Sequence, residues 1–256
     1  MKRFIDKSVL VTGAARGIGA AVATRLLAEG ATVIALDCDS QGLEALAERL
    51  RSDNLKLHCA DITDRQKIMS LVERIDEHYS LDGLVNAAGV MVSAPFEQLT
   101  AQAWLQLFEV NVHGTFHVSQ SVARCMVQRR RGAIVSVASN AASTPRVNLS
   151  GYCASKAAVA MLTRCMGLEL GKQGVRCNVV SPGSTRTPML HQLAGSDATL
   201  DQRMVQGDLG LHRIGIPLGK IAEPQDIAAG ITFLLSDDAN HITLQDLVMD
   251  GGATFG

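Results

Sequence analysis

Tyr152 and Lys156 are the residues of this sequence whose types and spacing most directly suggest chemistry. They lie at the start of an Ala-rich stretch expected to be helical, where a spacing of four places two side chains on one face, one turn apart. A tyrosine has a pKa near ~10, so a base active near neutrality needs a fall of roughly 3 pKa units, or about 4 kcal/mol. A nearby ammonium group and a second positive charge could supply this. We therefore predict that Tyr152 is a general acid/base whose pKa Lys156 lowers.

Two further polar residues could complete such a site. Ser139 closes a β-branched run, 132–139, that ends 13 residues before Tyr152. The carboxyl ends of parallel strands face the ligand crevice, so the Ser139 hydroxyl can reach the same substrate oxygen. Asn111 follows the preceding strand and could anchor a water that relays protons to Lys156. Its amide could instead bond only to backbone inside a helix, and both interpretations stay open.

A glycine-rich segment, Thr-Gly-Ala-Ala-Arg-Gly-Ile-Gly at 12–19, joins the first expected strand to the first expected helix. In this position the glycines permit a tight turn, an unobstructed approach of a pyrophosphate and close packing of helix on strand. The free N–H groups of the helix N-terminus favour a phosphate. Between a strand and a helix the pattern is typical of a dinucleotide site, and we expect contacts from Gly13, Arg16, Gly17, Ile18 and Gly19.

Asp37 ends the second expected strand, 20 residues after Gly17. A carboxylate there can accept hydrogen bonds from both ribose hydroxyls and repels a 2′-phosphate, which favours NAD over NADP. Arg16 points the other way, because a cation near the ribose can accommodate a 2′-phosphate. We give more weight to Asp37 and predict NAD as the cofactor.

Later strand ends offer further contacts to a dinucleotide. Asp61 ends the third expected strand and suits the adenine, with Ile62 beside the ring. Asn86, Ala87 and Gly89 end the fourth. The small residues let backbone approach the cofactor, whereas Asn86 could equally serve only to brace neighbouring strands.

The elements that must hold these residues follow from the pattern of apolar runs. Mostly unbroken apolar runs suit parallel strands that are covered on both faces. Ala/Leu-rich segments between them read as helices, and Ile18, Val22 and Leu26 form one apolar stripe. We therefore predict an α/β fold of the Rossmann type, a doubly wound, seven-stranded parallel sheet with helices on both faces. The strands are expected within 8–13, 31–37, 55–61, 81–89, 132–139, 175–183 and 243–252.

The region 187–215 breaks this rhythm, with Gly195, Gly207 and Gly210, polar residues and weak periodicity. It follows a strand's carboxyl end, so we interpret it as a mobile substrate lid; a plain surface insertion is the alternative. No linker or repeat interrupts the chain. Residues 1–256 are therefore expected to form a single dinucleotide-binding and catalytic domain.

Composition limits the class of protein. The 256 residues are 47% hydrophobic and carry a formal charge of -1, so a nucleic-acid partner is not expected. Six cysteines form no CxxC pair and seven histidines form no ligand motif, so we expect reduced thiols and no metal. There is no apolar run of membrane-spanning length and no signal-peptide pattern. The expectation is a soluble cytoplasmic protein without a membrane partner.

Taken in order, TGAARGIG, NAAG, Asn111, Ser139, YCASK and SPGSTRTP resemble the short-chain dehydrogenase/reductase family over essentially the whole chain. The resemblance implies a Ser139–Tyr152–Lys156–Asn111 tetrad, no metal, and hydride transfer at a hydroxyl or carbonyl carbon. Lys156 would also contact the nicotinamide ribose. It further implies a homotetramer, with 101–129 and 151–171 packed between subunits. By position, the nicotinamide pocket and its phosphate side would be formed by Pro182, Gly183, Thr185 and Thr187.

A narrower resemblance concerns the substrate. The stretches VRCNVVSPGSTRTPM, GIPLGKIAEPQDIA and HITLQDLVMDGG are similar to family members that oxidise a carboxylated dihydrodiol to a catechol with NAD. Such a substrate, held by Ser139 and Tyr152, needs a cation for its carboxylate. Arg146 is the first candidate, because a guanidinium can grip a carboxylate with two bonds; a surface ion pair is the alternative. Weaker candidates are Arg186, Arg203 and Arg213.

Two other functions are compatible with parts of this pattern. One is a 3-oxoacyl carrier-protein reductase that uses NADPH, against which Asp37 argues. The other is a dinucleotide-sensing module without turnover, against which the complete set of Ser139, Tyr152 and Lys156 argues.

Overall fold

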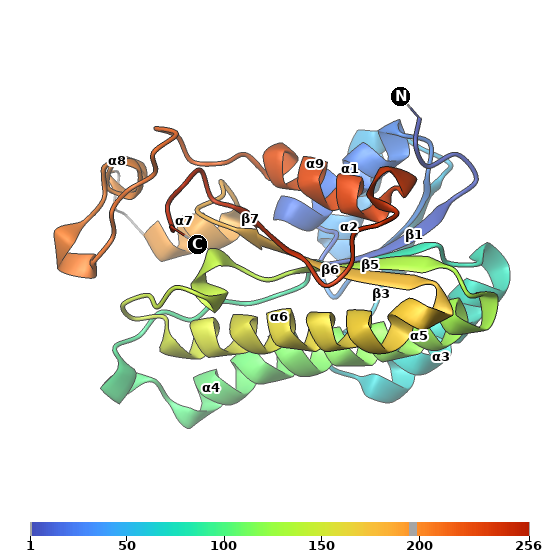
Figure 1. Ribbon diagram of the computed structural model, residues 1–256, viewed down its shortest axis with the longest axis horizontal. Coiled ribbons are helices and arrows are strands. Elements are labelled where there is room, and N and C mark those ends of the chain that lie inside the picture. The colour runs from blue at the N-terminus through green and yellow to red at the C-terminus, as the bar shows by residue number, and fades with distance from the viewer. Residues whose placement is uncertain (1, 195–198, 256) are drawn as a thin grey trace.

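A sheet of seven parallel strands runs through the molecule (Figure 1), whose computed structural model describes residues 2–194 and 199–255. In space the strands follow the order β3-β2-β1-β4-β5-β6-β7. Each lies within one of the runs assigned to strands from the sequence, so the predicted doubly wound, seven-stranded sheet is confirmed. The bounds are β1 (Ser8–Thr12), β2 (Thr32–Asp37), β3 (Leu55–Cys59), β4 (Gly83–Asn86), β5 (Gly132–Val137), β6 (Val175–Pro182) and β7 (Asp246–Met249).

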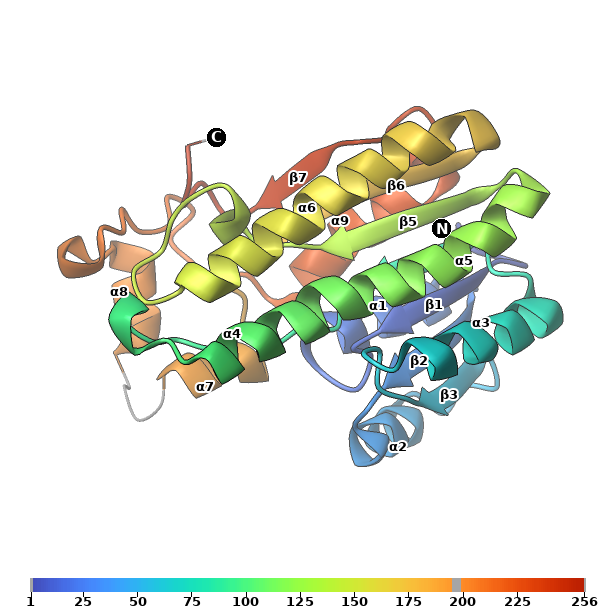
Figure 2. The ribbon, with the colours of Figure 1, turned by 90° about the horizontal axis from the view of Figure 1, so that it is seen from below.

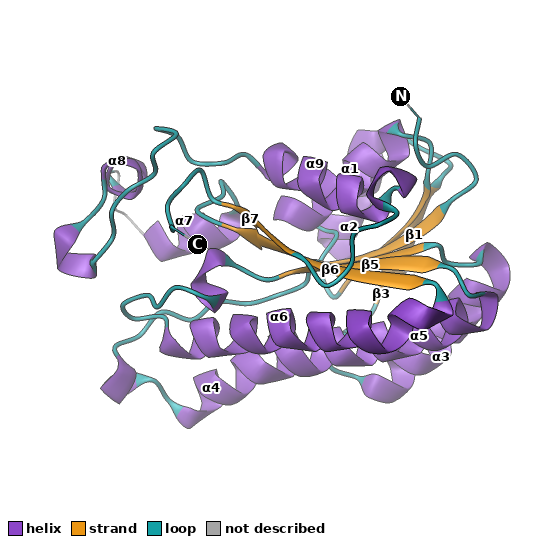
Figure 3. Ribbon diagram, in the orientation of Figure 1, coloured by secondary structure: helices purple, strands orange, loops and turns teal. Residues whose placement is uncertain are grey.

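Helices cover both faces of this sheet, as Figure 3 shows with the strands as a thin layer between them. One face carries α1 (Gly17–Ala28), α2 (Ser40–Leu50) and α9 (Pro224–Leu235). The opposite face carries α3 (Arg65–Tyr79), α5 (Thr115–Arg129) and α6 (Ser150–Leu170), with α4 (Ala101–Phe108) beside α6.

Burial on both faces explains why the strands read as unbroken apolar runs. In β1, Val9 and Val11 face the cluster that includes α1 and α9, whereas Leu10 faces the cluster that includes α3 and α5. All three side chains are buried. Successive strand residues point to opposite faces, so a strand covered on both sides needs apolar residues at every position.

The carboxyl ends of the strands meet at one edge of the sheet, and β1 lies there between β2 and β4. This reversal of strand order is where open α/β sheets bind ligands. The chain after β6 returns to this edge as α7 (Pro188–Ala194) and α8 (Leu200–Gln206), beyond the strand ends in Figure 2.

The expected lid at 187–215 therefore contains two short helices and the 3-10 turn Leu209–Leu211. Its residues 195–198 lie outside the described residues, and Gly195 is one of them. Leu190 and Met204 of its described parts pack in a small apolar cluster with Ile216 and Ile221, which follow the region in the sequence. The region is thus anchored to the chain that comes after it; its movement as a lid stays a prediction.

Two further features bear on the class of protein. No helix in the described ranges has both the length and the apolar character needed to cross a bilayer. Over the same part of the chain, no cluster of His, Cys, Asp or Glu side chains is arranged to hold a metal ion.

Candidate active site

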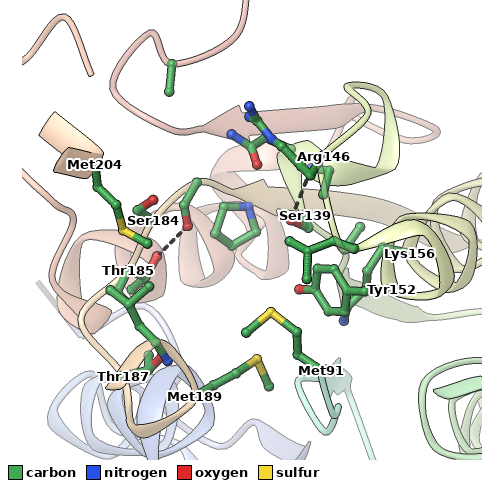
Figure 4. Close-up of a pocket in the computed structure, with 18 of the residues that line it drawn as sticks. Met91, Ser139, Arg146, Tyr152, Lys156, Ser184, Thr185, Thr187, Met189 and Met204 are labelled. Carbon is green, nitrogen blue, oxygen red and sulfur yellow. Dashed lines mark hydrogen bonds between the residues drawn. The ribbon is translucent and has the colours of Figure 1, made fainter. Parts of the chain in front are cut away.

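A cavity opens at the carboxyl edge of the sheet, and both Tyr152 and Lys156 line it (Figure 4). The end of β5 and the start of α6 form one wall. The loop after β6, with Thr185 and Thr187, and Met204 of α8 form the opposite wall. The predicted catalytic residues and the lid region therefore face one space.

Tyr152 and Lys156 lie together on α6, as their spacing predicted. The Nζ atom of Lys156 is 5.8 Å from the centre of the Tyr152 ring. Tyr152 is 9% exposed and Lys156 is 6% exposed. Lys156 Nζ donates a hydrogen bond to the carbonyl of Val137 at 2.9 Å, which ties α6 to the end of β5.

Ser139 follows β5 and is also buried against Tyr152. Its hydroxyl oxygen accepts a hydrogen bond from the N–H of Ala141 at 3.1 Å and so begins a 3-10 turn, Asn140–Ala142. Ser139 and Tyr152 both line the cavity. The contact of Ser139 with the substrate oxygen stays a prediction.

The protonation of Tyr152 differs from the expectation. Burial raises the pKa of Tyr152 to about 12, and the hydrogen bond with Ser139 opposes this rise. Burial also lowers the pKa of Lys156 to about 8. Both shifts run opposite to the predicted fall of the Tyr152 pKa, because removal from water penalises the charged form of both groups. The combined effect of Lys156 and NAD on the Tyr152 pKa stays a prediction.

Asn111 lies in a π-helical turn, Glu109–Gly114, between α4 and α5. Its Nδ2 atom donates to the carbonyl of Val90 at 3.0 Å and to Ser155 Oγ at 2.9 Å, and its Oδ1 accepts from the N–H of Val90 at 2.8 Å. These bonds use both amide hydrogens. Asn111 thus fixes the loop after β4 against α6, and an added π-helical residue is a frequent feature of functional sites.

Gly89 separates Asn111 from Lys156. A Cβ atom on Gly89 would lie 3.2 Å from Asn111 Oδ1 and 3.3 Å from Lys156 Nζ. The two polar groups therefore border the same small space, where the predicted water relay would run. Its occupation by water stays a prediction.

The glycine-rich turn before α1 has the close approaches that the sequence predicted. Gly13 has a φ of +66°, and a Cβ there would lie 2.6 Å from the backbone nitrogen of Ala88. A Cβ on Gly19 would lie 2.1 Å from the carbonyl oxygen of Gly13. No side chain caps the N-terminus of α1 at Arg16, so its N–H groups stay available to an anion. This turn therefore fits the pyrophosphate of a dinucleotide.

The other wall of this phosphate site comes from the segment after β6. The Thr187 methyl carbon lies 3.4 Å from a Cβ placed on Gly17, so Thr187 stands opposite the α1 N-terminus. Thr187 Oγ1 donates to the carbonyl of Thr185, and Thr185 Oγ1 to that of Gly183. Pro182, Gly183, Thr185 and Thr187 all line the cavity, as do Ile18, Ala87 and Gly89.

Asp37 is held at the adenosine side of this turn. Its Oδ2 accepts from the N–H of Ala15 at 3.0 Å and its Oδ1 from the N–H of Asp39 at 3.1 Å. Arg16, the residue after Ala15, is exposed. The negative charge at the end of β2 is therefore fixed by backbone, whereas the competing cation is on the surface.

Asp61 and Ile62 follow β3. Asp61 is exposed and accepts from the N–H of Thr63 at 2.9 Å. Ile62 is 6% exposed, and a Cβ on Gly114 would meet its side chain at 2.5 Å. Ile62 is thus mainly a core residue, and little of it is left to touch an adenine ring.

Asn86 has a bracing role. It is 3% exposed, and its Nδ2 donates to Ser119 Oγ at 2.9 Å and to Ser136 Oγ at 3.2 Å. These bonds tie β4 to α5 and β5. Of the two interpretations that the sequence left open, the contacts favour bracing over direct cofactor binding.

The four arginine candidates separate clearly. Arg146 and Arg213 both line the cavity. Arg186 is instead ion-paired with Asp201 at 2.5 Å and Glu223 at 3.0 Å, and Arg203 is ion-paired with Asp208. The suggestions of Arg186 and Arg203 as substrate ligands are thus wrong, because acidic neighbours outside the cavity hold both.

Sequence reasoning missed several residues of this site. Thr12 Oγ1 accepts from the N–H groups of Ala87 and Ala88, each at 3.2 Å, and so positions the loop after β4. Its signal is a polar residue at the end of an apolar strand. Apolar side chains from three separate segments also line the cavity, namely Met91, Met189 and Met204. Their separation in the sequence gave no pattern to detect.

The chain is similar to known proteins over nearly its whole length. The family model for short chain dehydrogenase matches residues 7–197. The chain is 45% identical over 254 residues to 2,3-dihydro-2,3-dihydroxybenzoate dehydrogenase of Escherichia coli K12, covering 99% of each chain. It is 42% identical over 253 residues to the protein of the same name from Bacillus subtilis 168, covering 98% of this chain and 97% of that one. A solved short chain dehydrogenase/reductase family protein superimposes with a TM-score of 0.86, at 34% identity and 98% coverage of both chains.

The family match covers strands β1 to β6, the glycine-rich turn and the Ser139–Tyr152–Lys156 wall. The two relatives align with this chain over nearly its whole length. This chain is an oxidoreductase that belongs to the short-chain dehydrogenase family.

Proposed function

We propose that this enzyme oxidises 2,3-dihydro-2,3-dihydroxybenzoate to 2,3-dihydroxybenzoate with NAD, the step that provides the catechol acid of catecholate siderophores. The names of the two relatives support the substrate. One observation in the structure carries the proposal: Arg146, which suits a carboxylate, lines the same cavity as Ser139 and Tyr152. A ring bearing both a carboxylate and a hydroxyl could contact all three.

The oxidation follows from the placement of these groups. Tyr152 would take the proton of one ring hydroxyl while Ser139 holds the same oxygen. Oxidised NAD, when bound, supplies the hydride acceptor and a positive charge near the phenol. The C–H bond of that carbon breaks as hydride leaves, and the resulting dienone tautomerises to the aromatic catechol. A second positive charge is needed because burial keeps the pKa of Tyr152 at about 12 in the chain alone.

Lys156 and Asn111 would act around this step. We assign Lys156 to the nicotinamide ribose and to the passage of the proton away from Tyr152, since its pKa near 8 allows it to give and take protons close to neutrality. Asn111 would hold the loop at Gly89 and border the water path. Asn111 is in this sense a positioning residue.

The preference for NAD rests on Asp37. Its carboxylate is fixed by the N–H groups of Ala15 and Asp39 at the point where the adenosine ribose is expected. A 2′-phosphate would meet this negative charge, whereas ribose hydroxyls can donate hydrogen bonds to it. The glycine-rich turn and Thr187 would hold the pyrophosphate. Arg16, on the surface, contributes less.

The test combines two signals. Purified protein is mixed with NAD and the dihydrodiol acid, and NADH absorbance and catechol fluorescence are followed together. Both should rise in equal molar amounts. A 3-oxoacyl thioester with NADPH serves as the control substrate for the reductase alternative, and turnover of that pair without the first would refute the proposal.

Arg146→Leu adds a test of the carboxylate contact. The Michaelis constant should rise by about 10- to 100-fold for the carboxylated diol, as expected for loss of a charge-assisted contact. It should stay unchanged for an uncharged cyclic alcohol. An equal effect on both substrates would contradict the assignment.

We also propose that the enzyme is a cytoplasmic homotetramer. Exposed apolar side chains on α4 and α6 support subunit contacts there: Leu105 is 59% exposed, Met161 57% and Leu168 73%. Light scattering should give four times the mass of 27.2 kDa. Leu168→Glu should reduce the assembly, whereas Lys67→Glu on the exposed side of α3 should not. Cell fractionation against a cytoplasmic marker tests the location.

A further inference from the structure

Arg213 lines the active-site cavity from the segment after α8, and the reaction above leaves it without a role. Its backbone pairs with Asp208 in both directions, each N–H donating to the other's carbonyl at 2.9 Å. This pair closes a turn over the 3-10 segment Leu209–Leu211. Arg213 is therefore presented to the cavity by a defined turn rather than by irregular chain.

Two glycines fix the base of this turn. Gly207 has a φ of +91°, and a Cβ on it would lie 2.7 Å from the carbonyl oxygen of Arg213. Gly215 has a φ of +89°, and a Cβ on it would lie 2.6 Å from the carbonyl oxygen of Val205. The two backbone segments are thus in close contact, which restricts where the Arg213 side chain can begin.

The acidic residue nearest to Arg213 in the sequence is engaged by other groups. The nearest acid in the sequence, Asp208, is engaged by Arg203 and by the N–H of Leu211 at 3.2 Å. Within the described ranges, no carboxylate lies at ion-pair distance from either Arg146 or Arg213. Asp208 attracts Arg213 from farther away, and Asp250 does the same for Arg146.

Two guanidinium groups thus share one partly desolvated cavity. Burial lowers the pKa of both, and the charge of Arg146 lowers the pKa of Arg213 further. Like charges in such a place are unfavourable until an anion joins them. A carboxylate is the anion whose two oxygens can serve two guanidinium groups.

We propose that Arg213 is a specificity-determining residue that grips the substrate carboxylate together with Arg146. The inference rests on the proposed function and extends it, because it assigns the carboxylate to two arginines, one that precedes α6 and one that follows α8. The contact between Arg213 and the carboxylate would also hold the turn 208–213 against a bound acid, whereas a neutral diol offers no such contact. Selection of carboxylated rings then depends on a residue far from the catalytic tyrosine in the sequence.

The test measures binding, so that it stays separate from turnover. Calorimetry on the protein–NAD complex compares 2,3-dihydroxybenzoate with catechol, its counterpart without the carboxylate. Arg213→Leu should weaken binding of the acid by about 10- to 100-fold and leave binding of catechol unchanged. Arg213→Lys should recover most of the affinity, since an ammonium still pairs with the acid. Arg186→Leu is the matched control, because Arg186 lies near the same segment but outside the cavity.

Thermal unfolding at low salt provides the second readout. Removing one of two like charges should leave the melting temperature of the free protein equal or higher, which loss of a merely structural side chain would not do. 2,3-Dihydroxybenzoate should raise the melting temperature of the wild type far more than that of Arg213→Leu. Arg213→Gln keeps a polar side chain and repeats the comparison should the leucine variant fold poorly.

The outcomes separate the two proposals. Equal loss of acid and catechol binding, or unchanged acid binding in Arg213→Leu, would overturn the role of Arg213. Tight, Arg213-dependent binding of the acid by a wild type that does not oxidise the dihydrodiol would leave that role standing and refute the proposed function.

Discussion

Lys156→Met should make the folded enzyme more stable at neutral pH while it removes activity. The Lys156 side chain is 6% exposed, and burial lowers its pKa from 10.5 to about 8. The difference corresponds to about 3 kcal/mol of unfavourable free energy when the group is charged. Loss of the hydrogen bond to the Val137 carbonyl takes back about 1 kcal/mol. The net gain expected for the methionine variant at pH 7 is about 2 kcal/mol.

The dependence on pH distinguishes this electrostatic cost from packing. Below pH 8, Lys156 is protonated in both the folded and the unfolded chain, so the full cost is present. Between pH 8 and 10.5 the unfolded chain keeps its proton while the folded chain loses it, so wild-type stability rises with pH. The advantage of the variant should therefore shrink by about 2.5 kcal/mol between pH 7 and pH 10.

The assay is urea unfolding of wild type and Lys156→Met, followed by circular dichroism at four pH values from 7 to 10. Lys67→Met, an exposed substitution on α3, is the matched control. Turnover of Lys156→Met should fall by about 100-fold or more, as expected for loss of a group in the proton path. An advantage that stays constant with pH, or a variant less stable than wild type at pH 7, would refute the reasoning that burial of this charge costs stability.

Three other substitutions test separate parts of the site. Tyr152→Phe should lower turnover by about 10²- to 10⁴-fold and leave the NAD affinity unchanged by calorimetry; retained turnover would remove Tyr152 from the mechanism. Gly19→Ala should destabilise the fold by about 1–3 kcal/mol in urea unfolding, because its Cβ would lie 2.1 Å from the Gly13 carbonyl oxygen. Gly171→Ala is its control, with nothing within 4 Å of the added atom. Asp37→Asn keeps the shape of the side chain and removes its charge, so kcat/KM with NADP should rise by about tenfold or more relative to kcat/KM with NAD. An unchanged ratio of the two values would show that Asp37 does not set the cofactor preference.

The local pattern of apolar residues was sufficient to predict the strands of the sheet. Unbroken apolar runs such as 8–13 and 132–139 contain β1 and β5, because a strand buried on both faces must be apolar at every position. The need for glycine at positions 13 and 19 could also be predicted from the sequence, since at each position backbone approaches too closely to leave room for a Cβ atom. The spacing of Tyr152 and Lys156 fixed their common face, because the helical period is a local property.

Other features depended on the assembled fold. The protonation of Tyr152 could not be predicted from its neighbour Lys156, since burial by surrounding elements sets the pKa of both. Of the four arginines considered, the sequence could not separate Arg186, which Asp201 of α8 and Glu223 just before α9 hold, from Arg213 in the cavity.

The sequence by itself therefore determined the order of strands and helices along the chain, the glycine-rich turn and the common helix face of Tyr152 and Lys156, all of which are encoded within a few neighbouring residues. Only the tertiary structure decided which charges are desolvated and which side chains share the cavity with Tyr152. The burial of a charge and the meeting of side chains in one cavity both depend on contacts between segments far apart in the chain. Such contacts produce no periodic pattern in the sequence.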